Sequence, residues 1–117
     1  MTDQSEPKKS ISLKVGEINA LKKAILYLKF SCEDAGADIF ASSSLINSTF
    51  ESLLEASDLG EMELKFYQKG NEVNEGYVIS RVNQMEARDG DVMSEDFKMR
   101  VCEAWMYPFR LTNNFAK

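Results

Sequence analysis

The stretch VGEINALKKAILYLKFSC, residues 15–32, decides the fold class. Its large apolar side chains recur at steps of three, four, three and four residues, which is the spacing of one face of an α-helix. Further apolar residues widen that face, so the helix must contact more than one neighbour and is expected at the centre of the domain. The stripe consists of Ile18, Leu21, Ile25, Leu28 and Cys32, and Ala24, Leu26, Tyr27 and Phe30 flank it.

The same helix carries several charged residues, which are predicted to face solvent: Lys22, Lys23, Lys29 and Glu33. Together with Lys14, the lysines form a basic face that either is solvated or meets an acidic surface of another copy or of a partner. Gly36 is predicted to end the helix, because glycine adopts the left-handed conformation of a C-cap at little cost.

Two more helices have recognisable start and stop signals. One is predicted from Leu45 to Asp58, with Gly60 as its terminator and a capping side chain from Ser42, Ser43 or Ser44. The other follows the capping residue Ser94 and has carboxylates in its first turn, where they interact favourably with the helix dipole. It ends before Pro108, and its buried stripe is predicted at Phe97, Val101, Ala104 and Trp105.

Residues 61–88 allow two interpretations. Apolar residues recur at helical steps from Met62 to Met85, and the glycines at 70 and 76 are tolerable in helices at a break or where two backbones pack closely. Alternatively, Met62, Leu64 and Phe66 alternate with charged residues, which is typical of a strand. We therefore predict a mainly α fold, a compact bundle of four to five helices, with an α+β fold carrying a β-hairpin at about 62–82 as the alternative.

The chain is expected to form one domain, as its 117 residues indicate. Residues 1–10 contain a proline and no large apolar side chain after Met1, so we expect a disordered tail. Residues 11–117 are predicted to be a single helical domain with a short aromatic C-terminal tail. We expect a homodimer, because a second copy of the chain would cover that tail and the wide apolar face of the first helix.

The composition excludes several classes of catalyst. The chain has no histidine and two cysteines, so the Ser-His-Asp and Cys-His hydrolases are excluded, as are histidine-containing and four-cysteine zinc sites. A calcium-binding EF-hand loop starting at Asp89 fails, because its sixth position is Ser94 and its twelfth is Arg100. The six glycines form no phosphate-binding loop. We expect no enzyme, no cofactor and no metal.

Cysteine use and hydropathy indicate a cytoplasmic protein. Cys32 and Cys102 each lie in an apolar stretch and are predicted to be buried, reduced thiols, with a disulfide as the less favoured alternative. The N-terminus shows no pattern of a secretory signal. The apolar segment from Ala24 to Phe30 is far shorter than the roughly 20 residues that span a bilayer, so no membrane association is expected.

Charge is distributed unevenly along the chain. Its 14 basic and 19 acidic residues give a net charge of −5, yet residues 1–30 carry six lysines against three acids. A mainly acidic body argues against direct nucleic-acid binding, which requires cations that neutralise phosphates. An alternative function is an acidic mimic that blocks a nucleic-acid-binding protein, through a cluster consisting of Glu86, Asp89, Asp91, Glu95 and Asp96.

The candidate partner-binding residues lie at the C-terminus. Aromatic residues that follow a proline in a short tail are hard to cover with the preceding helix, and aromatic and arginine side chains concentrate binding energy at interfaces. We therefore predict a small, acidic, non-enzymatic protein–protein interaction module, such as an adaptor, chaperone or inhibitor. Its predicted partner-binding residues are Trp105, Tyr107, Phe109, Arg110 and Phe115.

Overall fold

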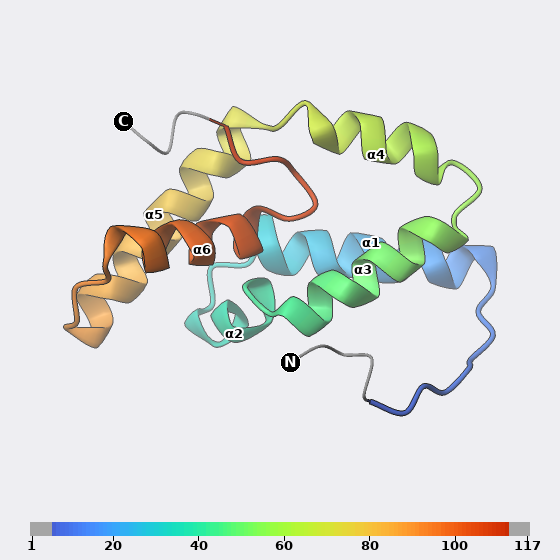
Figure 1. Cartoon of the computed structure of the whole chain (residues 1–117), viewed down its shortest axis with the longest axis horizontal. Helices are drawn as coiled ribbons and strands as arrows, with labels where there is room; N and C mark the ends of the chain where they lie inside the picture. The colour runs from blue at the N-terminus through green and yellow to red at the C-terminus, as the bar shows by residue number, and fades with distance from the viewer. Residues whose placement is uncertain (1–5, 113–117) are drawn as a thin grey trace.

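Helices account for most of residues 6–112, the part of the chain that the computed structural model describes (Figure 1). In this part of the chain there are six α-helices, one short 3-10 helix and no strand, so the mainly α prediction is confirmed. The elements are α1 (Val15–Phe30), η2 (Ala35–Ala37), α2 (Asp38–Ala41), α3 (Ser44–Ala56), α4 (Gly60–Gln68), α5 (Glu72–Asp89) and α6 (Glu95–Met106). The helix count exceeds the predicted four to five, because the single-turn α2 forms between the first predicted helix and the one predicted from Leu45.

The hairpin predicted as an alternative at 62–82 is wrong, because α4 and α5 occupy that segment. The two helices meet at Gly70, whose φ of 78° is a left-handed conformation that favours glycine. A Cβ at this position would lie 3.2 Å from the backbone oxygen of Arg110, so the C-terminal segment packs closely against the break. Met62, Leu64 and Phe66, which alternate with charged residues in the sequence, are 67%, 47% and 56% exposed on α4 and do not share one face.

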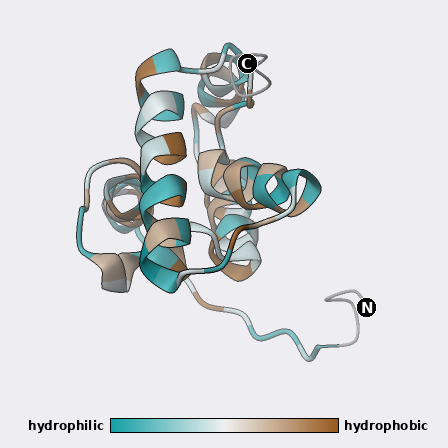
Figure 2. Cartoon of the chain, turned by 90° about the vertical axis from the view of Figure 1, so that its left-hand side faces the viewer, coloured by the Kyte–Doolittle hydropathy of each residue, from teal (hydrophilic) through white to brown (hydrophobic). Residues whose placement is uncertain are grey.

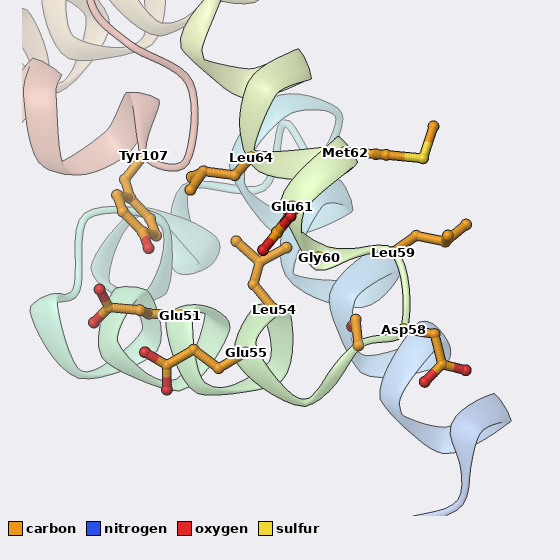
Figure 3. A pocket seen from close by; sticks show the side chains of 11 residues that line it. Glu51, Leu54, Glu55, Asp58, Leu59, Gly60, Glu61, Met62, Leu64 and Tyr107 are labelled. Atoms are coloured by element: carbon orange, nitrogen blue, oxygen red, sulfur yellow. The ribbon is translucent and has the colours of Figure 1, made fainter.

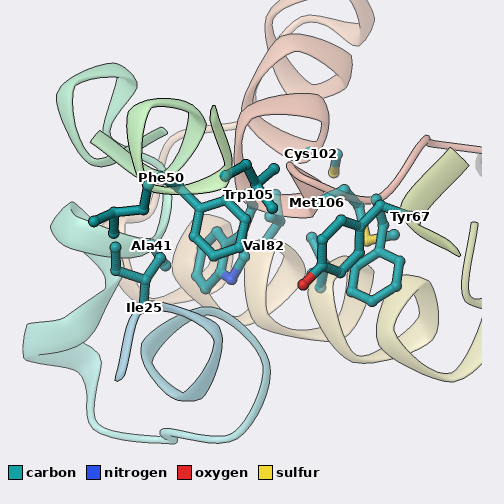
Figure 4. Packing of buried hydrophobic residues seen from close by; sticks show 12 residues of the cluster. Ile25, Ala41, Phe50, Tyr67, Val82, Cys102, Trp105 and Met106 are labelled. Atoms are coloured by element: carbon teal, nitrogen blue, oxygen red, sulfur yellow. The ribbon is translucent and has the colours of Figure 1, made fainter. Parts of the chain in front are cut away.

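The core forms where α1, α3, α5 and α6 meet (Figure 4). Helix α1 packs against α2, α3 and α5, which confirms its expected central position. Helices α5 and α6 pack against each other, and Val78 and Val82 of α5 are fully buried, as their helical spacing predicts. Figure 2 shows the N-terminal segment leaving the helical body. The central members are Ile25, Phe50, Val78, Val82, Cys102, Trp105 and Met106.

The buried face of α1 is rotated from the predicted stripe. Lys22, Ile25 and Lys29 are buried, whereas Leu21 and Tyr27 are exposed. The prediction that Lys22 and Lys29 face solvent is therefore wrong. Their ammonium groups are buried because partners satisfy them: Lys22 Nζ lies 2.8 Å from both carboxylate oxygens of Glu63 and from Ser57 Oγ.

Lys29 has backbone partners. Its Nζ donates to the carbonyl oxygens of Ala41 at 2.7 Å, Ala104 at 2.9 Å and Trp105 at 3.2 Å. These carbonyls lie in the last turns of α2 and α6, where helices have unsatisfied acceptors and negative partial charge. A single ammonium therefore caps two helices. Burial lowers the pKa of Lys29 from 10.5 to about 7.

The predicted start signals are confirmed and two of the predicted stops are wrong. Ser43 Oγ accepts from Ile46 N, and Ser94 Oγ accepts from Phe97 N. Helix α1 ends at Phe30 and not at Gly36, which belongs to η2. Gly60 opens α4 and does not close α3, and a Cβ there would clash with the backbone oxygen of Leu54.

Several other expectations concern the chain as a whole. Cys32 and Cys102 are free thiols, and Cys102 is fully buried. Residues 6–10 of the predicted N-terminal tail are exposed and non-helical, and residues 1–5 lie outside the described residues. Between residues 6 and 112, none of the helices has both the length and the apolarity needed to cross a bilayer.

Candidate functional site

The predicted partner-binding residues belong largely to the core. Trp105 is 1% exposed, and its Nε1 donates to Lys29 O at 2.7 Å. Tyr107 is half-buried, with its ring 6.3 Å from that of Phe50. Arg110 is exposed, while its backbone N donates to Tyr67 O. Phe115 lies outside the described residues.

The expected exposure of Phe109 is wrong, since its side chain is 8% exposed. The segment after Pro108 folds back over the bundle, and three rings from other helices cover Phe109. Their centroids lie 5.0 Å (Tyr67), 5.4 Å (Phe30) and 5.9 Å (Phe66) away in edge-on arrangements. The reasoning that one preceding helix cannot cover the tail overlooked α1 and α4. Partner binding through the C-terminal set stays a prediction, but within the described residues Trp105 and Phe109 are buried and Tyr107 alone of its rings is partly exposed.

The acidic cluster at residues 86–96 is partly neutralised within the fold. Glu86 accepts from Met93 N at 2.7 Å and pairs with Lys98 at 3.0 Å, and these bonds hold the pKa of Glu86 below its ordinary value. Asp89 pairs with Arg88, and Glu95 and Asp96 occupy the first turn of α6. Glu86 therefore has a structural role at the α5–α6 turn.

An open groove lies where α3 ends and α4 begins, and we name it the α3–α4 groove. It has a volume of about 570 Å³. Leu54 forms its buried floor and Leu64 points towards it, while the exposed side chains of Leu59 and Met62 lie at its outer edge and point away from Leu54 (Figure 3). Figure 3 shows Tyr107 entering from the end of α6, with Glu51 and Glu55 along the adjacent edge of α3. A hollow of this size suits a few side chains of a binding segment.

The turn that shapes this groove is held by specific contacts. Ser57 caps α3 with its backbone N on Leu54 O, and its Oγ donates to Leu53 O at 2.7 Å. Lys22 of α1 binds the same Oγ and Glu63 of α4. Because the Lys22 ammonium joins the turn to α4, residues 57–60 have a fixed path, and this path leaves Leu59 61% exposed.

The rim of the groove is strongly acidic. Among its eleven lining residues four are carboxylates and none is basic. None of the four takes part in an ion pair among the described residues. Burial, and then the charges of Glu51 and Glu55, raise the pKa of Tyr107 above its ordinary value. The groove therefore has a negative potential over an apolar floor, from Glu51, Glu55, Asp58 and Glu61.

These carboxylates do not form a recognisable metal centre. Among residues 6–112, no three His, Cys, Asp or Glu side chains are arranged so that they could hold a metal ion. Burial raises the pKa of the Cys102 thiol to about 11, which disfavours the nucleophilic thiolate. The chemistry that the groove offers is the binding of a cationic, apolar group.

Sequence reasoning missed the groove, although two signals for it are present. The four acids recur at steps of four, three and three residues across the α3–α4 boundary. Leu59, Met62, Leu64 and Phe66 are too many and too dispersed for the single buried stripe of a nine-residue helix.

Compared with models of protein families, with curated protein sequences and with solved structures, the chain shows no match to any of them.

Proposed function

We propose that this protein is a non-enzymatic protein-binding module that holds a basic, apolar segment of a partner protein in the α3–α4 groove. The observation that carries the proposal is the pairing of exposed apolar side chains with four carboxylates that form no ion pair among the described residues. This retains the interaction module predicted from sequence and assigns it a different surface.

The apolar part of the groove supports binding by burial. Leu59, Met62 and Leu64 are 61%, 67% and 47% exposed, and they lie within one short stretch around a turn. Exposed apolar side chains that gather in one patch mark binding surfaces, whereas scattered ones do not. Covering such side chains contributes about 25 cal/mol per Å² of apolar area removed from water.

The charged part of the groove defines the partner. Carboxylates around an apolar floor attract lysine and arginine and repel acidic segments, which gives specificity and faster association. A helix or an extended strand with apolar anchors and flanking cations satisfies both parts of the site. An adaptor, chaperone or inhibitor binds its partner in this way without transforming it.

We also propose a cytoplasmic location. The support is that both cysteines are free and that Cys102 is buried without a partner thiol. Thiols of this kind suit a reducing compartment.

A binding titration tests the proposed function. The probe is a fluorescein-labelled synthetic peptide with leucines on one helical face and lysines elsewhere, compared with a version in which glutamates replace the lysines. Anisotropy is expected to show saturable one-to-one binding of the lysine peptide only. Glu51→Lys/Glu55→Lys and, separately, Leu64→Asp should each weaken binding by about tenfold or more, because each removes one half of the site.

A matched control separates the groove from general charge attraction. Asp91 and Glu103 are exposed and lie outside the groove. The variant Asp91→Lys/Glu103→Lys changes the net charge by the same amount as the groove variant and should bind the peptide as the wild type does. If both variants weakened peptide binding equally, the effect would come from the net charge of the protein alone, and the proposal would be overturned.

A further inference from the structure

We propose that the α3–α4 groove also receives the N-terminal arm of a second copy of this chain, so that two chains exchange arms in a two-fold dimer. The arm is defined as residues 6–14, which precede α1. This inference rests on the proposed function, since it assigns an occupant and a regulation to the same groove.

The arm has the chemistry that the groove selects. Its sequence EPKKSISLK holds three lysines and one glutamate, and its apolar residues are Ile11 and Leu13. Ile11 is 79% exposed, while Leu13 packs partly against the core and anchors the arm. Among the described residues, no backbone hydrogen bond outside the helices involves residues 6–13. The arm therefore offers an apolar side chain, flanking ammonium groups and an unpaired backbone.

The arm of the same chain leaves its own groove open. Figure 1 shows the segment before α1 running below the helical body, whereas α4 lies at its upper edge, and Figure 2 shows this segment leaving the body. Leu59 and Met62 stay exposed in that arrangement. Residues 6–12 span at most about 23 Å when extended, which is enough to cross from the surface of one small domain into another.

The root of the arm and the groove lie on the same side of the molecule. A second hollow, of about 370 Å³, is lined by Val15 and Ile18 from the start of α1. It shares Ser57, Asp58 and Leu59 with the α3–α4 groove, so the two hollows flank one turn. A two-fold interface requires that each copy present donor and acceptor on one self-complementary face. When two copies pair about a two-fold axis beside this turn, the arm of each copy enters the groove of the other.

The face that carries the arm and the α3–α4 groove is complementary to the same face of a second copy, both in its charges and in its apolar residues. Lys8, Lys9 and Lys14 of one copy face the four acids of the other copy's groove. Pairing also covers apolar side chains that the single chain leaves in water, which are Ile11, Val15, Leu59 and Met62. Because arm and partner segment use one groove, dimerisation and partner binding are expected to compete.

Sedimentation velocity of the full-length protein tests the inference. At micromolar concentration and low salt the wild type should sediment with twice the monomer mass of 13.3 kDa, and it should dissociate as the salt rises towards about 0.5 M. Lys8→Glu/Lys9→Glu and Glu51→Lys/Glu55→Lys should each raise the dimer dissociation constant by about tenfold or more. Lys23→Glu/Arg100→Glu, which reverses two exposed cations outside the arm, should dimerise as the wild type does.

Mixing the two charge-reversed variants gives the sharpest result. The arm variant has an acidic arm and an acidic groove, whereas the groove variant keeps its basic arm beside a groove in which two introduced lysines cancel the charges of Asp58 and Glu61. The arm variant therefore repels itself and the groove variant loses its attraction, yet in the heterodimer the basic arm meets four intact acids and the acidic arm meets the two introduced lysines. An equimolar mixture is therefore expected to recover the dimer, and circular dichroism should show that both variants are folded.

Three results would overturn the inference: a wild type that stays monomeric, a dimer that survives both reversals, or a mixture that stays monomeric. The proposed function is tested separately, by titrating the arm variant with the lysine peptide. If the peptide binds but the protein does not dimerise, only the proposed exchange of arms is overturned. If the protein dimerises as described but does not bind the peptide, only the proposed binding of a partner protein is overturned.

Discussion

Lys29 and Trp105 hydrogen-bond to each other in both directions. Trp105 Nε1 donates to Lys29 O at 2.7 Å, and Lys29 Nζ donates to Trp105 O at 3.2 Å. Both side chains are almost completely buried. The pair joins the end of α1 to the end of α6, and the same ammonium reaches α2 through Ala41 O. The helix ends that meet at the centre of the fold therefore depend on one lysine.

Replacing Lys29 by methionine is expected to lower the free energy of unfolding by about 2–3 kcal/mol. Methionine keeps the aliphatic volume but leaves three buried carbonyl oxygens without their donor, and each lost bond costs about 1 kcal/mol. Methionine also avoids the free-energy cost of taking a charged ammonium out of water, which offsets part of this loss. Urea unfolding measures the change, with the exposed Lys23→Met as the control. A variant as stable as the wild type would show that these hydrogen bonds contribute nothing net.

The buried ammonium also predicts a pH dependence. The pKa of Lys29 is about 7 in the folded chain and 10.5 in the unfolded reference, so the unfolded state binds more protons between these values. Stability must therefore rise with pH above about 7, by up to about 1.4 kcal/mol per pH unit. Unfolding should be measured from pH 7 to about 8, below the ordinary pKa values of cysteine and tyrosine, because burial raises the pKa of Cys102 to about 11 and its thiol opposes the slope at higher pH. The slope should be absent in Lys29→Met, and equal slopes in both proteins would contradict the assignment.

Two glycines are expected to respond to alanine with opposite signs. Gly60→Ala brings a Cβ against the backbone oxygen of Leu54, which cannot move freely, so we expect a loss of about 2 kcal/mol or more. Gly76→Ala lies inside α5 with no atom within 4 Å of the added Cβ, so we expect a gain of about 0.5–1 kcal/mol. Thermal unfolding of both variants tests the prediction. Equal effects would refute the tight turn at residues 57–60.

Phe109→Ala is expected to act as a core mutation. Deleting a buried ring that contacts three others costs about 3–5 kcal/mol, whereas Arg110→Ala, at an exposed neighbour, should change stability by less than about 0.5 kcal/mol. Chemical unfolding separates the two variants. A fully stable Phe109→Ala protein that loses partner binding would restore the aromatic tail as the binding face.

The helices were predictable because their signals are local. Apolar spacing identified α1, α3 and α6, and capping serines marked the starts of α3 and α6. Residues 61–88 are ambiguous, since Met62, Leu64 and Phe66 alternate as in a strand although all three are exposed side chains of a short helix. The helices separate at Gly70, where φ is positive and an added Cβ would crowd the backbone oxygen of Arg110, a residue 40 positions away that no local pattern contains.

The rotation of α1 and the groove were not predictable, for related reasons. Lysine is ordinarily exposed, and only the carbonyls of Ala41, Ala104 and Trp105, from two other helices, make the interior acceptable to Lys29. The groove likewise combines residues 51–64 with Tyr107, and only the tertiary fold brings these together. The local sequence indicates a surface position for Phe109, because the helices that cover it are distant in the sequence.

Chemical-shift mapping of the labelled full-length protein with the unlabelled leucine–lysine peptide tests the central claim most directly, because it locates the binding site. The largest shifts are predicted at residues 51–64 and at Tyr107, saturating together at one equivalent, and Glu51→Lys/Glu55→Lys should abolish them. Shifts centred on residues 86–96 or on the C-terminal segment, or no saturable shifts at all, would contradict the claim that the α3–α4 groove is the binding surface.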